Sequence, residues 1–127
     1  MGKEGAGKLV AEKRTSKDCV FCRIIEGELP SVKLYEDDKI IAIEDINRQA
    51  PFHALLISKE HVESLLEVKD WRIISHIFEI IKFLAEEYKL AEKGFRVVNN
   101  CGDDGGQTIY HLHFHLLGGR SMGWPPG

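Results

Sequence analysis

The first recognisable apolar pattern is the stretch "CVFCRIIEGELP" over residues 19–30. Its apolar residues at 20, 21, 24 and 25 recur at helical spacing. Gly27 and Pro30 follow them and are residues that end helices. This stretch therefore predicts a short helix of one or two turns.

Three extended segments come next. "VKLYE" and "KIIAIED" flank the turn dipeptide Asp37-Asp38, which predicts a β-hairpin. "HALLIS" is a further β-rich run that follows the break at Pro51. We expect these three strands to adjoin in one antiparallel sheet.

The longest helical pattern begins at Asp70, a residue type suited to an N-cap, and continues to about Leu90. Apolar residues recur along it with i, i+3, i+4 spacing, and Gly94 lies beyond its end. Phe78 and Phe83 widen the apolar band beyond what covering one sheet requires. The width favours contact of this helix with a second subunit, and a deep core within one subunit is the alternative.

The chain ends in two further predicted strands. "FRVVNN" supplies the fourth, the glycine-rich loop "CGDDGGQT" turns the chain, and "HLHFHL" over residues 111–116 makes the fifth. Strands early, a helix in the middle and strands late predict an α+β fold rather than alternating βαβ units.

The last strand carries histidine at every second position. Because side chains alternate across a strand, His111, His113 and His115 share one face, and the leucine and phenylalanine residues between and after them share the other. The apolar face suits core packing. The three imidazoles, spaced at roughly 7 Å, need a chemical explanation.

Composition narrows the class of protein. The chain has 127 residues, enough for one domain, and 17 Lys and Arg against 20 Asp and Glu give a net charge of -3. No basic stripe suggests nucleic acid as a partner, and no apolar run reaches the length of a membrane span. Residues 1–17 are rich in Lys, Gly and Glu without a signal-peptide core, so we expect a flexible leader before a domain at 18–127, in a cytoplasmic protein.

The three cysteines are too few for a disulfide framework. Cys19 and Cys22 form a C-x-x-C pair that invites a metal, with two reduced thiols at a helix start as the alternative. We interpret Cys101 as a small residue at a strand end rather than a nucleophile.

Two uses of the histidine strand compete. Three neutral imidazoles can ligate zinc, or one can attack phosphorus while its neighbours donate to the phosphate oxygens. The loop before the strand favours phosphate, because Gly105 and Gly106 let main-chain N–H groups approach an anion and Gln107 and Thr108 add side-chain donors. His76, on the long helix, is interpreted as an ordinary, partly exposed histidine.

These residues resemble a known family. "HLHFHLL" is similar to the signature of the histidine triad (HIT) nucleotide hydrolases and transferases, and "GGRSMGWPPG" resembles the Hint branch, the purine nucleoside phosphoramidase-like proteins. Further resemblance lies in "IIEGELPSVKLYEDD", "AIEDINRQAPFHALLISKEH" and "VVNNCGDDGGQTIYH", so that it extends from about Asp18 to Gly127. It implies a five-stranded antiparallel sheet with one long and one short helix, in a homodimer paired through the long helix and a strand.

The resemblance also implies roles for individual residues. His113 is the nucleophile, His115 donates to a phosphate oxygen and His53 aids proton transfer to the leaving amine, as a neutral imidazole permits. The implied nucleotide contacts are Asp45 with the ribose; Phe21, Ile24, Ile43 and Ile46 with the base; Asn100, Gly106, Gln107 and Thr108 with the phosphate; and Trp124 in the other subunit's site. For Phe21 and the isoleucines, plain core packing is the alternative.

In some members, chiefly bacterial ones, residues matching Cys19, Cys22, His61 and His111 form a closed structural zinc site. The resemblance therefore implies zinc here and no organic cofactor. Gly123 departs from the pattern, because the branch often has histidine before the terminal Trp-Pro-Pro-Gly, and this leaves the leaving-group preference open. Glu44 stands where other members vary.

The expected activity is hydrolysis of the P–N bond of purine nucleoside 5′-phosphoramidates through a nucleotidyl-histidine intermediate, with an AMP or GMP type of product. One alternative is hydrolysis of dinucleoside polyphosphates or nucleotidyl transfer, against which the "WPPG" tail argues. A nucleotide-binding adaptor without catalysis is the other.

Overall fold

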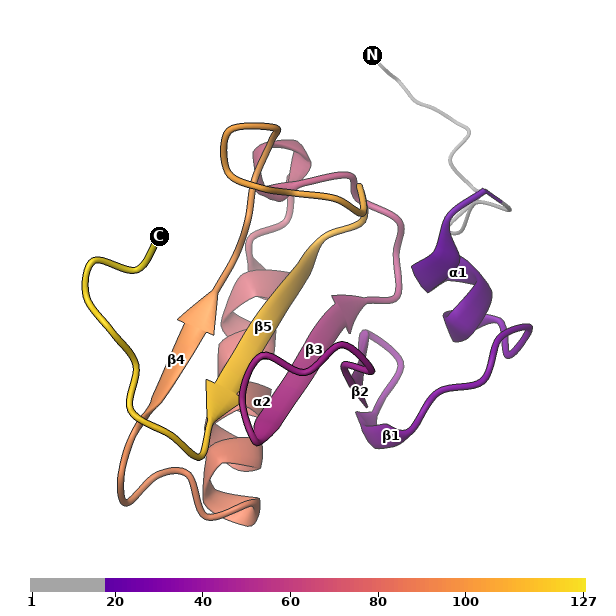
Figure 1. Ribbon diagram of the computed structural model, residues 1–127. Coiled ribbons are helices and arrows are strands. Elements are labelled where there is room, and N and C mark those ends of the chain that lie inside the picture. Colours follow the sequence, from indigo (N-terminus) through magenta and orange to yellow (C-terminus); the bar gives the residue numbers. More distant parts are fainter. Residues whose placement is uncertain (1–17) are drawn as a thin grey trace.

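A computed structural model describes residues 18–127. It has an antiparallel sheet in the order β1-β2-β3-β5-β4, which confirms the predicted α+β fold with five strands, one long helix and one short helix. The leader predicted over residues 1–17 lies outside the described residues. The elements, drawn in Figure 1, are α1 (Val20–Ile25), β1 (Lys33–Glu36), β2 (Ile40–Glu44), β3 (Phe52–Ser58), the 3-10 helix η2 (Leu65–Glu67), α2 (Arg72–Glu87), β4 (Phe95–Val98) and β5 (His113–Gly118).

The β1–β2 hairpin is closed by Asp37. One carboxylate oxygen accepts from the main-chain N–H groups of Lys39 and Ile40 at 2.8 and 2.9 Å, and the other accepts from the Tyr35 hydroxyl at 2.7 Å. The second oxygen also lies 2.6 Å from Nε2 of His76 on α2. Asp37 therefore ties the hairpin turn to the long helix, and His76 has a specific partner that the sequence did not reveal.

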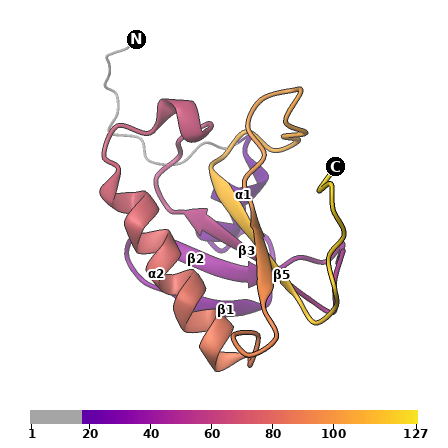
Figure 2. The same ribbon diagram turned by 90° about the vertical axis from the view of Figure 1, so that its left-hand side faces the viewer.

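The two faces of the sheet pack against different helices. Figure 2 shows α2 running across one face, where fully buried apolar residues of β2, β3 and β5 meet the apolar side of the helix. On the opposite face a smaller apolar cluster joins Phe21 of α1 to residues of β2 and β3. The residues of that smaller cluster are Phe21, Ile41, Ile43, Leu55 and Ile57. The histidine face of β5 lies on this second side.

The long helix differs from the prediction at both ends. It starts at Arg72, although Asp70 accepts from the Arg72 main-chain N–H at 3.1 Å and so still serves the first turn. It ends at Glu87, because Lys89 has a positive φ of 63° that breaks the helical path before Leu90. No helix among residues 18–127 is long and apolar enough to cross a membrane.

The start of the last strand was predicted wrongly. β5 begins at His113, and His111 lies before it, fully buried. The reason is a tertiary contact, since the main-chain N–H of Leu112 donates to the carbonyl of Val62 at 2.7 Å rather than to a strand of the sheet. The alternation of faces nevertheless holds, because Leu112 and Phe114 pack on the α2 side.

Candidate active site and metal cluster

A cavity of about 490 Å³ opens on the α1 side of the sheet. Its walls come from α1, the β2–β3 loop, the loop after β4 and the histidine face of β5. With the exception of Trp124, every residue that the sequence suggested for catalysis or nucleotide binding lines it. These residues are Phe21, Ile24, Ile43, Asp45, Ile46, His53, Asn100, Gly106, Gln107, Thr108, His113 and His115.

His113 is held in one tautomer. Its Nδ1 lies 2.6 Å from the main-chain carbonyl of His111, which can only accept, so Nδ1 carries the proton of the neutral ring. The lone pair is then on Nε2. The ring packs edge-on against Phe21, with centroids 4.9 Å apart, and the Asn99 side chain donates to the His113 carbonyl at 2.9 Å. An oriented imidazole with a free lone pair beside a cavity is arranged as a nucleophile.

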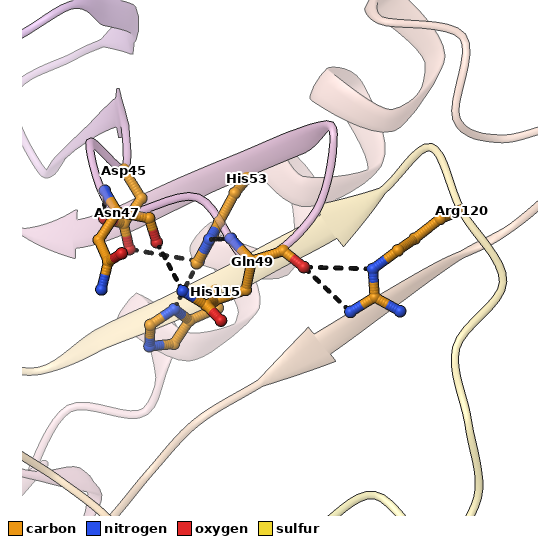
Figure 3. Close-up of polar contacts among 6 residues, drawn as sticks. All are labelled: Asp45, Asn47, Gln49, His53, His115 and Arg120. Carbon is orange, nitrogen blue, oxygen red and sulfur yellow. Dashed lines mark hydrogen bonds and ion pairs between the residues drawn. The ribbon is translucent and has the colours of Figure 1, made fainter.

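His53 and His115 form a second oriented unit, drawn in Figure 3. The main-chain N–H of Gln49 donates to Nδ1 of His53 at 3.1 Å, so the proton of neutral His53 is on Nε2. That nitrogen lies 2.9 Å from Nδ1 of His115 and 3.3 Å from a carboxylate oxygen of Asp45. His53 therefore donates to His115, and His115 in turn carries its own proton on Nε2.

The protonation states agree with this geometry. Burial lowers the pKa of both His53 and His113, although the Asp45 carboxylate acts in the opposite direction. Burial, followed by repulsion from His113 and His53, lowers the pKa of His115 to about 4. All three rings are accordingly neutral at pH 7, which is the state that a nucleophile and a chain of donors require.

Asp45, His53 and His115 also lie close enough together to hold a metal ion. A metal on Nε2 of His53 would require the ring proton to move to Nδ1. That nitrogen already accepts from the Gln49 N–H, so the main chain opposes metal ligation there. We therefore interpret these three residues as a hydrogen-bonded relay.

The loop at 101–108 differs from the expected phosphate cradle. The Gln107 side chain accepts from the Gly102 N–H and donates to the carbonyls of Glu63 and Ile109 at 2.8 and 3.1 Å. The main-chain N–H groups of Gly106 and Gln107 also donate within the loop. In this arrangement the Gln107 amide shapes the loop, and its suggested contact with a phosphate stays a prediction.

The same loop explains one of its glycines. A Cβ on Gly105 would collide with the main chain of Cys101, so only glycine fits where the loop folds back on itself. Thr108 and Asn100 remain at the cavity wall. Their suggested contact with a phosphate stays a prediction.

Two further candidates lie at the surface. Ile46 lines the cavity mouth and is 100% exposed, the arrangement of an apolar residue that a planar base can cover. Trp124 is 83% exposed and does not line the cavity of its own chain. Its suggested role in the other subunit's site stays a prediction.

Asp45 accepts from the Asn47 N–H at 2.9 Å through one oxygen and faces His53 with the other.

The four predicted metal ligands form a compact cluster next to the cavity. Nδ1 of His111 lies 3.2 Å from Sγ of Cys19, 3.5 Å from Sγ of Cys22 and 3.2 Å from Nδ1 of His61. Sγ of Cys22 is 3.2 Å from Nδ1 of His61. These separations are close to the roughly 3.3–3.8 Å edges of a tetrahedron built from ordinary Zn–N and Zn–S bonds.

The chemistry of the cluster also fits a cation. Nε2 of His111 lies 2.6 Å from the carbonyl of Ser58 and must donate to it, so Nδ1 presents a lone pair to the centre of the cluster. A metal-bound histidine that donates its other N–H to a carbonyl is the usual arrangement. Two thiols and two ring nitrogens thus converge on one point, as a Cys₂His₂ zinc site requires.

Comparison with known proteins agrees with this site. Residues 26–122 match the HIT domain family. The chain belongs to the HIT domain family. It is 44% identical over 112 residues to a maize (Zea mays) protein named 14 kDa zinc-binding protein, covering 85% of this chain and 87% of the relative. It is also 44% identical over 112 residues to Adenylylsulfatase HINT1 of Arabidopsis thaliana, covering 85% and 76%.

Solved HIT structures share the fold. The crystal structure of a HIT family hydrolase from Legionella pneumophila has a TM-score of 0.84 and 45% identity, covering 86% of this chain and 99% of that one. The order and direction of strands described above are therefore those of a HIT domain.

Sequence reasoning missed Gln49 and Asn99, which act through their polar groups on His53 and on the main chain of His113. Gln49 gave no signal, because it contributes a main-chain N–H that any residue other than proline would supply. Asn99 belongs to the segment "FRVVNN", in which nothing distinguished it from a strand end.

Proposed function

We propose that this HIT protein is a hydrolase that cleaves the P–N bond of purine nucleoside 5′-phosphoramidates and releases a nucleoside monophosphate and an amine. The observation that carries the proposal is the opposed polarity of two neighbouring imidazoles. His113 presents a lone pair on Nε2, whereas His115 presents an N–H, and both line one cavity. A nucleophile beside a donor is what phosphoryl transfer needs.

In the proposed first step Nε2 of His113 attacks the phosphorus, the P–N bond breaks and a nucleotidyl-histidine forms. The His111 carbonyl stabilises the positive charge that the ring acquires, through Nδ1–H. When the phosphate anion binds beside Asp45, the His53–His115 pair takes up one proton from solvent, and His115 passes that proton to the amine as the P–N bond breaks. In the second step water attacks the phosphorus, returns that proton to the relay and frees His113.

A His113→Ala variant tests the proposal. We expect turnover of adenosine 5′-phosphoramidate to fall by about 10³-fold or more, with AMP binding retained, because the variant loses the nucleophile and keeps the cavity. His76→Ala, which removes a histidine remote from the cavity, should leave turnover intact. Mass spectrometry of quenched wild-type protein should find the nucleotide on His113. Equal inactivity of wild type and variant would instead favour a nucleotide-binding adaptor.

A second substrate class follows from the Arabidopsis relative, whose name describes an adenylylsulfatase. Cleavage of a P–O–S linkage would use the same nucleotidyl-histidine, but sulfate leaves as a weak base and needs no proton. Comparing adenosine 5′-phosphosulfate with the phosphoramidate in one assay decides between the two classes.

We propose that Cys19, Cys22, His61 and His111 hold a structural Zn²⁺. The maize relative is named a zinc-binding protein, and the donor set matches a closed tetrahedral site. When bound, the metal would fasten the residues on either side of Phe21 to the segment that carries His113. Metal analysis of the purified protein tests the assignment, and a metal-free protein that is fully folded would refute it.

We also propose that the protein is a homodimer that pairs through β4 and the neighbouring side of α2. β4 is an edge strand of the sheet, and Phe95 at its start is 42% exposed. Phe78 of α2 is 46% exposed and packs edge-on against Phe114 of β5, the strand next to β4. An open sheet edge beside exposed aromatic rings favours pairing of two copies.

A further inference from the structure

We propose that Arg120 is a positioning residue that sets the tautomers of His53 and His115 by holding the main chain of Gln49. Arg120 lies outside the cavity lining, so it acts through other residues. The kinetic consequence rests on the proposed hydrolase function, whereas the tautomers themselves can be measured without any substrate.

Arg120 binds the main chain of the β2–β3 loop at Gln49, on the side away from His53, as Figure 3 shows. Its Nε and Nη2 both donate to the Gln49 carbonyl, at 3.2 and 3.0 Å, and Nη1 donates to the carbonyl of Ser121 at 2.9 Å. Two charge-assisted bonds from one planar guanidinium fix both the position and the direction of a carbonyl. Arg120 thus holds the 49–50 peptide by its C=O, and the 48–49 peptide, which meets it at the Gln49 Cα, points its N–H to His53.

The chain path after β5 makes this contact possible. Gly119 has a positive φ of 93°, and a Cβ there would lie 2.9 Å from Cβ of Pro51. The segment that leaves β5 therefore turns tightly against the end of the β2–β3 loop. This close passage brings Arg120, the next residue, within reach of Gln49.

Few other contacts among residues 18–127 hold the chain at Gln49. Residues 46–49 are all exposed, and the first buried residue after them is Ala50. The loop has a bond from the Asn47 N–H to Asp45 at 2.9 Å, one from the Gln49 side chain to the Asn47 carbonyl at 3.1 Å and a 4.0 Å ion pair of Arg48 with Glu44. The two bonds from Arg120 are the ones that hold the Gln49 carbonyl.

The direction of the relay depends on the 48–49 peptide together with Asp45, whose carboxylate oxygen lies 3.3 Å from Nε2 of His53 and also favours a proton there. While the Gln49 N–H faces His53, Nδ1 of His53 accepts, Nε2 donates and His115 keeps its proton on Nε2. If the peptide turned away, His53 could carry its proton on Nδ1. His115 would then have to donate back from its own Nδ1 and would lose the Nε2–H that faces the cavity. The reversed chain offers a lone pair, not a donor, to a phosphate oxygen or a leaving amine.

Kinetics of three arginine variants test the role. For Arg120→Ala we expect kcat for adenosine 5′-phosphoramidate to fall by about three- to tenfold, with KM changed by less than about twofold, because substrate contacts are intact and the active tautomer is diluted. Arg120→Lys keeps the positive charge but not the planar pair of N–H groups that meets the Gln49 carbonyl, so its kcat should lie between those of wild type and Arg120→Ala. Arg96→Ala is the matched control, since Arg96 bonds the Gly123 carbonyl of the tail at 2.8 Å without touching the loop.

The ¹⁵N resonances of the histidine rings provide the readout that a merely structural role would not move. In wild type, His53 and His115 should each show a protonated Nε2 and an unprotonated Nδ1, and in Arg120→Ala both should show averaged values while His113 stays protonated on Nδ1. Unchanged tautomers in a folded Arg120→Ala protein would overturn the proposal. Arg120 would then serve only to hold the C-terminal segment against the β2–β3 loop. Averaged tautomers in a protein that hydrolyses no phosphoramidate would uphold it and refute the hydrolase function alone.

Discussion

The main-chain carbonyl of His111 accepts the Nδ1–H of His113 at 2.6 Å, so a residue whose side chain belongs to the Cys/His cluster also orients the ring at the cavity. Loss of one ligand should therefore affect both stability and activity. For Cys22→Ser we expect bound zinc to be lost and the melting temperature to fall by about 10 °C or more, since metal binding contributes to folding.

Turnover of the folded Cys22→Ser fraction should fall as well, because the segment that carries His111 is no longer fastened. Metal analysis, thermal unfolding and steady-state assays on the same sample check this. Cys101→Ser is the control, as Cys101 lies outside the cluster. A Cys22→Ser protein with wild-type melting temperature and turnover would contradict the linkage.

Removal of His53 should distinguish leaving groups. His53→Ala deletes the donor to His115, so substrates that release a basic amine should lose about 10²-fold in kcat, whereas a phosphosulfate, which releases a weak base, should lose about tenfold or less. The ratio of the two rates in wild type and variant measures the difference. Equal losses for both substrates would show that His53 serves the shape of the site rather than proton transfer.

Asp37 should make the free energy of unfolding depend on pH in the acid range. Burial alone would raise the pKa of this carboxyl, but hydrogen bonds from Tyr35, the Ile40 and Lys39 amides and His76 lower it far below its ordinary value of 3.8. A group with a depressed folded-state pKa stabilises the fold above its unfolded pKa, and that contribution is lost as the pH falls below it.

We therefore expect Asp37→Asn to reduce the free energy of unfolding by roughly 1–2 kcal/mol at pH 7. The gap between the variant and wild type should narrow as the pH falls below about 4. Urea unfolding at several pH values measures it. The exposed neighbour Asp38 provides the control, because Asp38→Asn removes the same charge without these bonds. A constant gap at every pH would mean that the loss is one of packing.

The dimer proposal has a matched pair of variants on one helix. Phe78 and Phe83 are each 46% exposed, but Phe78 packs on Phe114 near β4, whereas Phe83 packs on Tyr35 at the opposite edge of the sheet. We expect Phe78→Glu to shift the protein to a monomer in sedimentation equilibrium and Phe83→Glu to leave the dimer intact. The reverse result would move the interface to the β1 side.

Much of the fold was predictable from local patterns. Alternation and turn residues located the hairpin at Asp37-Asp38, and helical spacing located α2, because each pattern reflects which side of an element is buried. The errors occurred where tertiary contacts decide. His111 looked like a strand residue, yet its segment bonds to Val62, and the end of α2 depends on Lys89 adopting a conformation that residue type does not predict.

The residues of the site were predictable, but the tautomer of each imidazole and the direction of each hydrogen bond were not. Side chains such as His53 and Thr108 could be named in advance because their chemistry is distinctive. The bonds of Gln107 could not be predicted, since its amide is equally suited to bind a phosphate or to brace a loop, and its bonds to Gly102 and Glu63 depend on tertiary structure. The main-chain groups that fix each imidazole leave no trace in residue identity.

The unpaired edge of β4 has a consequence for aggregation. In a single chain this strand pairs with β5 on one side only, so its other row of amide and carbonyl groups is available to any extended peptide. A variant that cannot pair symmetrically, such as Phe78→Glu, should therefore be a monomer in dilute solution and should aggregate through this strand edge at high concentration.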